Sequence, residues 1–88
     1  MSYDEDKSSK LFITNLPPNV SSDLLAKDIE PMFANFGQIK ALNVKRHQSG
    51  MYSYAFLEYE NTEDAQRAEK KMDQAEVHGR PMKVYDLL

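Results

Sequence analysis

The sequence predicts a small α+β domain in which a four-stranded antiparallel sheet carries two helices on one face. Three observations predict this architecture. The segments 11–16 and 52–59 carry apolar side chains on both faces of a period-two strand. The segments 21–36 and 62–72 place apolar residues three or four positions apart, which is typical of helices. Two further strand-like segments complete the sheet, at 39–46 and 82–85.

The composition narrows the class of protein. The 88 residues allow one small domain, and 41% of them are apolar, which is enough for a modest core. The chain has no cysteine, and His47 and His78 lack the spacing of a metal site, so we expect neither a metal nor a cofactor. No apolar run approaches the roughly 20 residues that span a bilayer, and no signal peptide follows Met1. We therefore expect no membrane contact and a nuclear or cytoplasmic location, with the nucleus favoured.

The net charge of −3 argues against nucleic-acid binding through phosphate contacts alone. Acidic residues concentrate at the N-terminus and around the second predicted helix. Basic residues lie near the predicted strands: Lys40, Lys45, Arg46, Arg80 and Lys83. A sheet that is less negative than the helical side is compatible with an anionic ligand on the sheet.

The first half of the chain begins with polar residues that lack periodicity. Residues 1–9 are predicted to form a flexible lead-in to a domain at 10–86. The first strand covers about Lys10 to Asn15, and the turn-forming sequence 17–19 ends it. Ser21 or Ser22 is the expected N-cap of the first helix.

The apolar face of the first helix comprises Leu25, Ile29, Met32, Phe33 and Phe36, and Gly37 is predicted to end the helix. Pro31 interrupts this pattern, because a proline inside a helix costs roughly 3 kcal/mol. The helix either runs through Pro31 with a kink or breaks near Lys27 and restarts with Asp28 as a cap. We favour the restart. In that case Asp28 and Glu30 serve the dipole of a helix start.

The second half of the chain supplies three strands and a helix. The strand at 39–46 directs Leu42 and Val44 inward, with Asn43 and Lys45 outward. The strand at 52–59 follows a polar loop. Asn61 or Thr62 is expected to cap a helix whose narrow apolar stripe comprises Ala65, Ala68 and Met72. The segment 79–81 leads to the last strand, in which Met82 and Val84 face inward and Lys83 and Tyr85 face outward.

This order of elements is that of the split β-α-β, or ferredoxin-like, βαββαβ sandwich. Its first and third strands form the centre of the sheet and both helices cover the same face. Leu11, Ile13 and their counterparts on the third strand then fill the core. Phe12, Tyr54 and Phe56 are left on the uncovered face, where large rings are costly to expose unless something stacks on them.

Two motifs indicate a family. The segment 52–59 matches the octapeptide K/R-G-F/Y-G/A-F-V-x-F/Y at six of eight positions, counting leucine for valine and the free position. The segment 11–16 is similar to the companion hexapeptide, with its aromatic residue second. The segment 79–84 resembles the usual entry into the fourth strand. Over about 10–85, the chain resembles an RNA recognition motif (RRM) domain.

The resemblance implies that aromatic residues of the two central strands stack on splayed bases. By position, Phe12 and Tyr54 are the expected platforms, and Phe56 contacts sugars between them. Specificity is expected from residues that can reach base edges, and phosphate contacts from the segment 45–47. The expected RNA-binding residues are Phe12, Tyr54, Phe56, Asn43, Lys45, Lys83, Tyr85, Tyr52 and Arg46.

The octapeptide departs from the family pattern at two positions. Tyr52 replaces a basic residue that commonly contacts phosphate, and Ser53 replaces a glycine. With roughly two neutralised phosphates, the log–log dependence of affinity on salt should have a shallow slope of about −1.4. The first helical region is also longer than usual, and its extra turn at Leu24 and Leu25 is expected to lie outside the standard core.

The partner expected from these features is a single-stranded RNA of about two to four nucleotides, bound by a monomer in mRNA processing or ribonucleoprotein assembly. The alternative is a protein-recognition module, with a partner on the helical face or over the rings. Retention of the sheet aromatics and the loop sequence 80–82 favour RNA. No motif of a nucleophile, a phosphate-binding loop or an acid–base pair is present, so we expect no enzyme.

Overall fold

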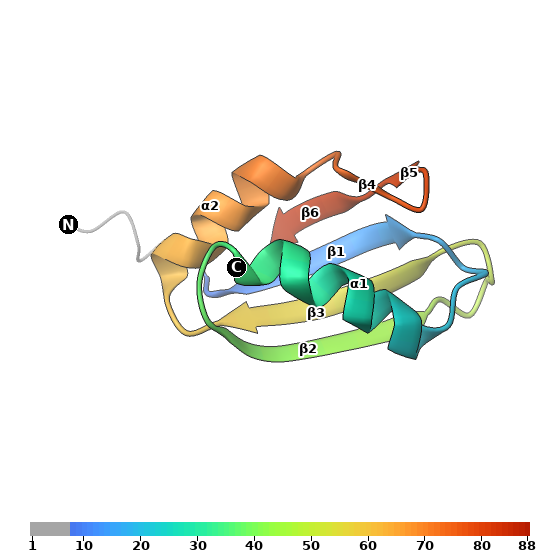
Figure 1. Ribbon diagram of the computed structural model, residues 1–88, viewed down its shortest axis with the longest axis horizontal. Coiled ribbons are helices and arrows are strands. Elements are labelled where there is room, and N and C mark those ends of the chain that lie inside the picture. Colours follow the sequence, from blue (N-terminus) through green and yellow to red (C-terminus); the bar gives the residue numbers. More distant parts are fainter. Residues whose placement is uncertain (1–7) are drawn as a thin grey trace.

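The computed structural model describes residues 8–88, and within this range it has the predicted architecture. Figure 1 shows both helices on the same side of a twisted sheet. The elements are β1 (Lys10–Leu16), α1 (Ser22–Ala34), β2 (Ile39–Arg46), β3 (Ser53–Tyr59), α2 (Thr62–Met72), β4 (Glu76–Val77), β5 (Arg80–Pro81) and β6 (Lys83–Asp86). Neither helix in residues 8–88 is long and apolar enough to span a membrane.

The main sheet has the strand order β2-β3-β1-β6 and is antiparallel throughout. The predicted central position of the first and third strands is therefore confirmed. Alternate residues of these strands face the helices and are fully buried, since Ile13 is 0% and Leu57 is 1% exposed. The opposite face of the sheet is covered by neither helix, and we call it the open face.

Helix α1 begins as predicted but does not break. The Ser21 hydroxyl accepts a hydrogen bond from the Leu24 N–H at 3.2 Å, which confirms it as the N-cap. The helix then continues through Pro31, so the expected restart at Asp28 is wrong. The physical reason is the buried face, where Leu25, Ile29 and Phe33 are all 0% exposed. Burying each of them contributes roughly 1.5–3 kcal/mol, and together they outweigh one proline.

The continuous helix changes the roles of three residues. Leu25 belongs to the core, not to a turn outside it, whereas Leu24 is 55% exposed. Asp28 and Glu30 lie within α1 and do not serve a helix start. Instead, Oδ2 of Asp28 lies 2.7 Å from Nε2 of His78, in the turn between β4 and β5. This pair connects α1 to a segment 50 residues further along the chain.

Gly37 lies beyond the end of α1. Glycine is required at this position for a different reason from the predicted one. The C-cap is Asn35 in a right-handed conformation, and the Phe36 N–H donates to the Phe33 carbonyl at 3.1 Å. The φ of Gly37 is not among the positive values in residues 8–88, so the glycine is not needed to reverse the chain. It is needed for space, because a Cβ atom at this position would overlap the side chain of Asp64.

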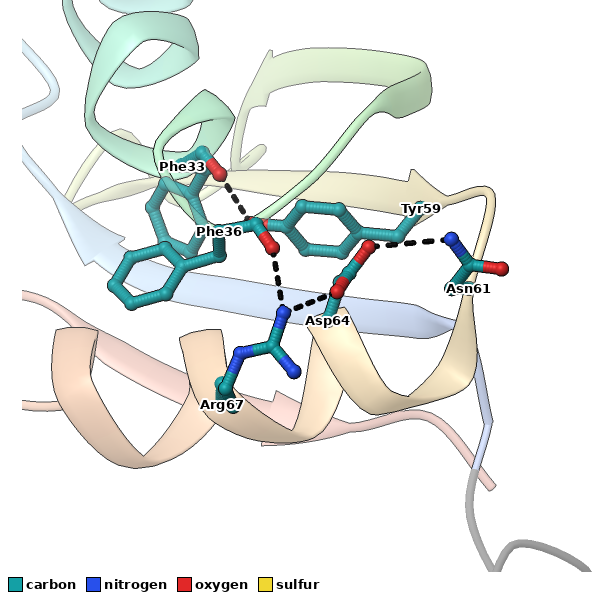
Figure 2. Close-up of polar contacts among 6 residues, drawn as sticks. All are labelled: Phe33, Phe36, Tyr59, Asn61, Asp64 and Arg67. Atoms are coloured by element: carbon teal, nitrogen blue, oxygen red, sulfur yellow. Dashed lines mark hydrogen bonds and ion pairs between the residues drawn. The ribbon is translucent and has the colours of Figure 1, made fainter.

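A polar cluster joins the end of α1 to the start of α2 (Figure 2). Arg67 donates to the Phe36 carbonyl at 3.0 Å and also to the carboxylate of Asp64. Asn61 is the N-cap of α2, but its side chain makes no capping bond and instead donates to Oδ2 of Asp64 at 3.4 Å. The carboxylate of Asp64 therefore links the residue that precedes α2 to Arg67 within the helix.

Tyr59 anchors β3 to the end of α1 beside this cluster. Its ring is 1% exposed and its hydroxyl donates to the Phe33 carbonyl at 2.6 Å (Figure 2). Burial, helped by the negative charge of Asp64 and opposed by Arg67, raises the pKa of Tyr59 well above its usual value. The folded protein therefore keeps this phenol protonated at a pH where the unfolded chain releases the proton.

This difference in pKa predicts a loss of stability in alkaline solution. Above pH of about 10 the unfolded chain binds fewer protons than the folded protein, so the free energy of unfolding should fall by about 1.4 kcal/mol per pH unit. Tyr59→Phe should cost about 1 kcal/mol near pH 7, through the lost hydrogen bond, and should lack this extra alkaline slope. Urea unfolding of both proteins from pH 7 to 11 measures the difference. Parallel pH profiles would contradict the assignment.

The last strand of the sheet is preceded by a hairpin that was not predicted from the sequence. Strand β6 begins at Lys83, one residue after the predicted start, and Met82 is fully buried before it. Strands β4 and β5 pair through a two-residue turn in which His78 has φ 50° and Gly79 has φ 82°. Two positive φ values are typical of the tight turns that match the twist of a hairpin.

Part of the predicted lead-in is bonded to the sheet. The Ser9 carbonyl accepts from the Tyr59 N–H at 2.9 Å, and the Ser8 N–H donates to the carboxylate of Asp86 at 3.2 Å. The same carboxylate accepts from the Leu88 N–H at 2.8 Å, so Asp86 joins both end segments of the described chain. The rest of the lead-in, residues 1–7, lies outside the described residues.

Candidate nucleic-acid interface

Strand register aligns the side chains of the open face in rows that cross the sheet. The central row follows from three direct pairings, Asn43 with Phe56, Phe56 with Phe12, and Phe12 with Tyr85. Because alternate residues of a strand share a face, all four side chains leave the sheet on the open side. We call Phe12, Tyr54, Phe56 and Tyr85 the aromatic cluster, since Tyr54 lies next to this row on β3.

The Phe12 ring is in contact with each of the other three rings of the aromatic cluster. The Phe12 ring centroid lies 5.2 Å from that of Phe56, 5.9 Å from that of Tyr54 and 6.4 Å from that of Tyr85. Tyr54 and Phe56 meet edge to face at 5.8 Å. Phe56 is 43% and Tyr85 48% exposed, whereas Phe12 and Tyr54 are half-buried. The cluster is an apolar surface held in place by its own ring contacts.

Two further rows flank the central one. On one side Lys45 lies opposite Tyr54, and Lys83 lies opposite Thr14, which places an exposed cation on each edge strand. On the other side lie Ala41, Glu58, Lys10 and Leu87. Residues 8–88 contain no group of three or more histidine, cysteine or acidic side chains that could hold a metal ion.

Seven of the nine predicted site residues share the open face: Phe12, Asn43, Lys45, Tyr54, Phe56, Lys83 and Tyr85. The other two do not. Arg46 pairs with Ser53, whose side chain is buried, so alternation directs Arg46 to the helical side of the sheet. Tyr52 precedes β3 and stacks on His47, with ring centroids 4.5 Å apart.

Lys10, Glu58 and Leu87 also lie on the open face, although they were not among the predicted site residues. Lys10 precedes Phe12 by two positions, Glu58 follows Phe56 by two, and Leu87 follows Tyr85 by two. The period of two that identified the rings could also have identified these neighbours. Arg80 is a further basic residue, but its guanidinium group is already hydrogen-bonded within the protein. It donates to Oδ1 of Asn15 at 2.8 Å and to the Met51 carbonyl at 3.3 Å.

The sequence model of one family, the RNA recognition motif, matches residues 11–83. The chain belongs to this family. The resemblance found in the two strand motifs is thus confirmed, together with the ferredoxin-like fold. The RRM match begins at the second residue of β1 and ends at the first residue of β6.

Known RNA-binding proteins and a solved RRM domain are similar to this chain. The zebrafish (Danio rerio) RNA-binding protein with serine-rich domain 1 is 36% identical over 74 residues, which cover 81% of this chain and 25% of that protein. The third RRM of Pes4 is 28% identical, with a TM-score of 0.77 and coverage of 91% of this chain and 92% of that one. The Sxl-lethal protein/RNA complex is 25% identical, with a TM-score of 0.71 and coverage of 89% of this chain and 46% of that one. The chain spans 10–28% of the length of five curated relatives that it matches.

The RRM octapeptide of this chain contains one unusual buried group. Ser53 stands where the family pattern has glycine, and it is 1% exposed. Its hydroxyl has no hydrogen-bond partner in residues 8–88. The side chain faces the helices, since it alternates with Tyr54, so it leaves the open face unchanged.

Proposed function

We propose that this RRM binds short single-stranded RNA on its open face, in mRNA processing or ribonucleoprotein assembly, and that it acts as a monomeric binding module, without catalysis, mainly in the nucleus. The observation that carries the proposal is the aromatic cluster, four touching rings on the side of the sheet that the helices leave uncovered. RRM domains stack splayed bases on such rings. The similarity to a protein solved as an RNA complex supports the same ligand.

The exposure of the rings favours a different division of roles from the one expected by position. Phe56 is 43% exposed, whereas Tyr54 is half-buried between Lys45, His47 and the other rings. A base needs an accessible ring face to stack on. The Phe56 ring offers the more accessible face, so we propose it as a stacking platform alongside Phe12 and Tyr54, which are both half-buried.

Polar residues around the aromatic cluster are suited to hydrogen bonds with base edges. The Asn43 side chain is exposed at one end of the central row and can both donate and accept. Lys45 and Lys83 are exposed on β2 and β6 and can donate to phosphate or to base carbonyl groups. Stacking tolerates any base, so these groups would supply selectivity.

Loss of the central ring tests the proposal. Phe12→Ala should weaken binding of a short RNA by about tenfold, because one base–aromatic stack contributes roughly 1–3 kcal/mol. Fluorescence anisotropy with a labelled hexanucleotide measures the affinity. The expected NMR shifts on titration lie on Phe12, Asn43, Tyr54, Phe56 and Lys83.

Leu24→Ala is the matched control, since Leu24 is a large exposed side chain on α1. It should leave the affinity unchanged. Equal affinities for the wild type and Phe12→Ala, or RNA-induced shifts confined to α1, would contradict binding on the open face. Shifts of residues 22–36 with a protein ligand, and none with RNA, would support the protein-recognition alternative.

A further inference from the structure

A shallow pocket lies on the open face beside Phe56, on the side away from Tyr54. Its volume is about 300 Å³, at the small end of the range for small-molecule sites. The lining residues come from β1, β2, β3 and the segment after β6: Lys10, Ala41, Asn43, Phe56, Leu57, Glu58 and Leu87. Of these residues, only Asn43 and Phe56 have a role in the RNA-binding function proposed above.

The walls of the pocket suit a flat, partly polar group. Phe56 and Leu87 are 43% and 42% exposed and supply apolar surface. The Leu87 position is held by a hydrogen bond from its N–H to the Lys10 carbonyl at 3.0 Å. A base that extends the stack on Phe56 would therefore enter a space that already exists between these two side chains.

The polar part of the pocket contains an unusual group for an RNA-binding surface, the carboxylate of Glu58. Its side chain is 26% exposed and Oε2 lies 4.0 Å from Nζ of Lys40. A register shift between Ile39 and Ala41 leaves Lys40 without a paired residue on β3. Such bulges redirect side chains. Lys40 and Lys10 flank Glu58, so the negative charge is offset where a phosphate would pass.

We propose that this pocket takes cytosine in preference to uracil, and that Glu58 determines this specificity. A carboxylate can only accept hydrogen bonds. Cytosine presents an amino donor on C4, where uracil presents a carbonyl acceptor. Uracil would therefore place one acceptor against another, whereas cytosine, with the same ring size, would donate to Glu58.

The inference rests on the proposed function and is tested by comparing two RNAs. Hexacytidylate and hexauridylate have the same length and charge. The wild type should bind hexacytidylate about tenfold more tightly, because hydrogen bonds to a charged group are among the stronger ones. In Glu58→Gln the amide can accept or donate, so the preference should fall to about twofold or less. Anisotropy at pH 7.5 and one salt concentration measures both affinities.

Glu30→Gln is the control, because it removes the same charge from an exposed position on α1. It should retain the tenfold preference. Equal binding of the two RNAs by the wild type, or an unchanged preference in Glu58→Gln, would overturn this inference and leave Phe12-dependent binding intact. If neither RNA binds, the proposed function itself fails and the inference fails with it.

Discussion

Pro31→Ala is expected to stabilise the domain by about 2 kcal/mol. Pro31 lies inside α1, is exposed, and has no N–H to donate to the carbonyl of Lys27. In a helix interior proline is roughly 3 kcal/mol less favourable than alanine. The value expected here is smaller because Pro31 lies in the last turn of α1, where helices fray.

Urea unfolding at pH 7 measures this gain as a higher midpoint with the same slope. Pro18→Ala is the matched control, since Pro18 lies in the turn before α1. That replacement should cost up to about 1 kcal/mol, because it frees the unfolded chain without restoring a helical bond. A Pro31→Ala protein no more stable than the wild type would mean that the helix requires the proline.

Gly37→Ala is expected to destabilise the domain by about 3 kcal/mol, more than a glycine replacement in an open loop. The added Cβ would overlap the Asp64 carboxylate and would lie 2.7 Å from the Asp64 Cβ, closer than atoms of this kind approach. Overpacking costs roughly 1–3 kcal/mol. Displacing Asp64 would also disrupt its bonds to Arg67 and Asn61, and with them the connection to the Phe36 carbonyl.

A double-mutant cycle separates this clash from a general effect of the replacement. Asp64→Gly removes the three side-chain atoms nearest to the new Cβ. In that background Gly37→Ala should cost less than about 1 kcal/mol. The same loss in both backgrounds, measured by urea unfolding, would show that the Asp64 side chain is not the cause.

Most of the fold and much of the candidate site could be predicted from local patterns. Alternation along a strand identified Phe12, Tyr54 and Phe56 as outward-facing, and the register bears this out. The Ser21 cap is likewise a local interaction, between a hydroxyl and an N–H three residues away. The same alternation also places Lys10 and Glu58 beside the rings, although neither residue is aromatic.

Features that depend on segments distant in the sequence could not be predicted in this way. The continuity of α1 through Pro31 was decided by burial of Leu25, Ile29 and Phe33 against the sheet, which outweighs a local preference. The need for glycine at position 37 arises from the approach of α2. The β4–β5 hairpin places His78 beside Asp28 of α1. Nothing in the local sequence around either residue predicts this contact.

The sequence by itself determined the order of the elements, the two faces of each strand and the family, because those properties depend on residues close to one another along the chain. Only the tertiary structure decided that Lys10, Asn43, Glu58 and Leu87 line one pocket beside Phe56. These residues come from four separate segments. Strand pairing and a register shift set their neighbours, and both result from the packing of the whole sheet against its helices.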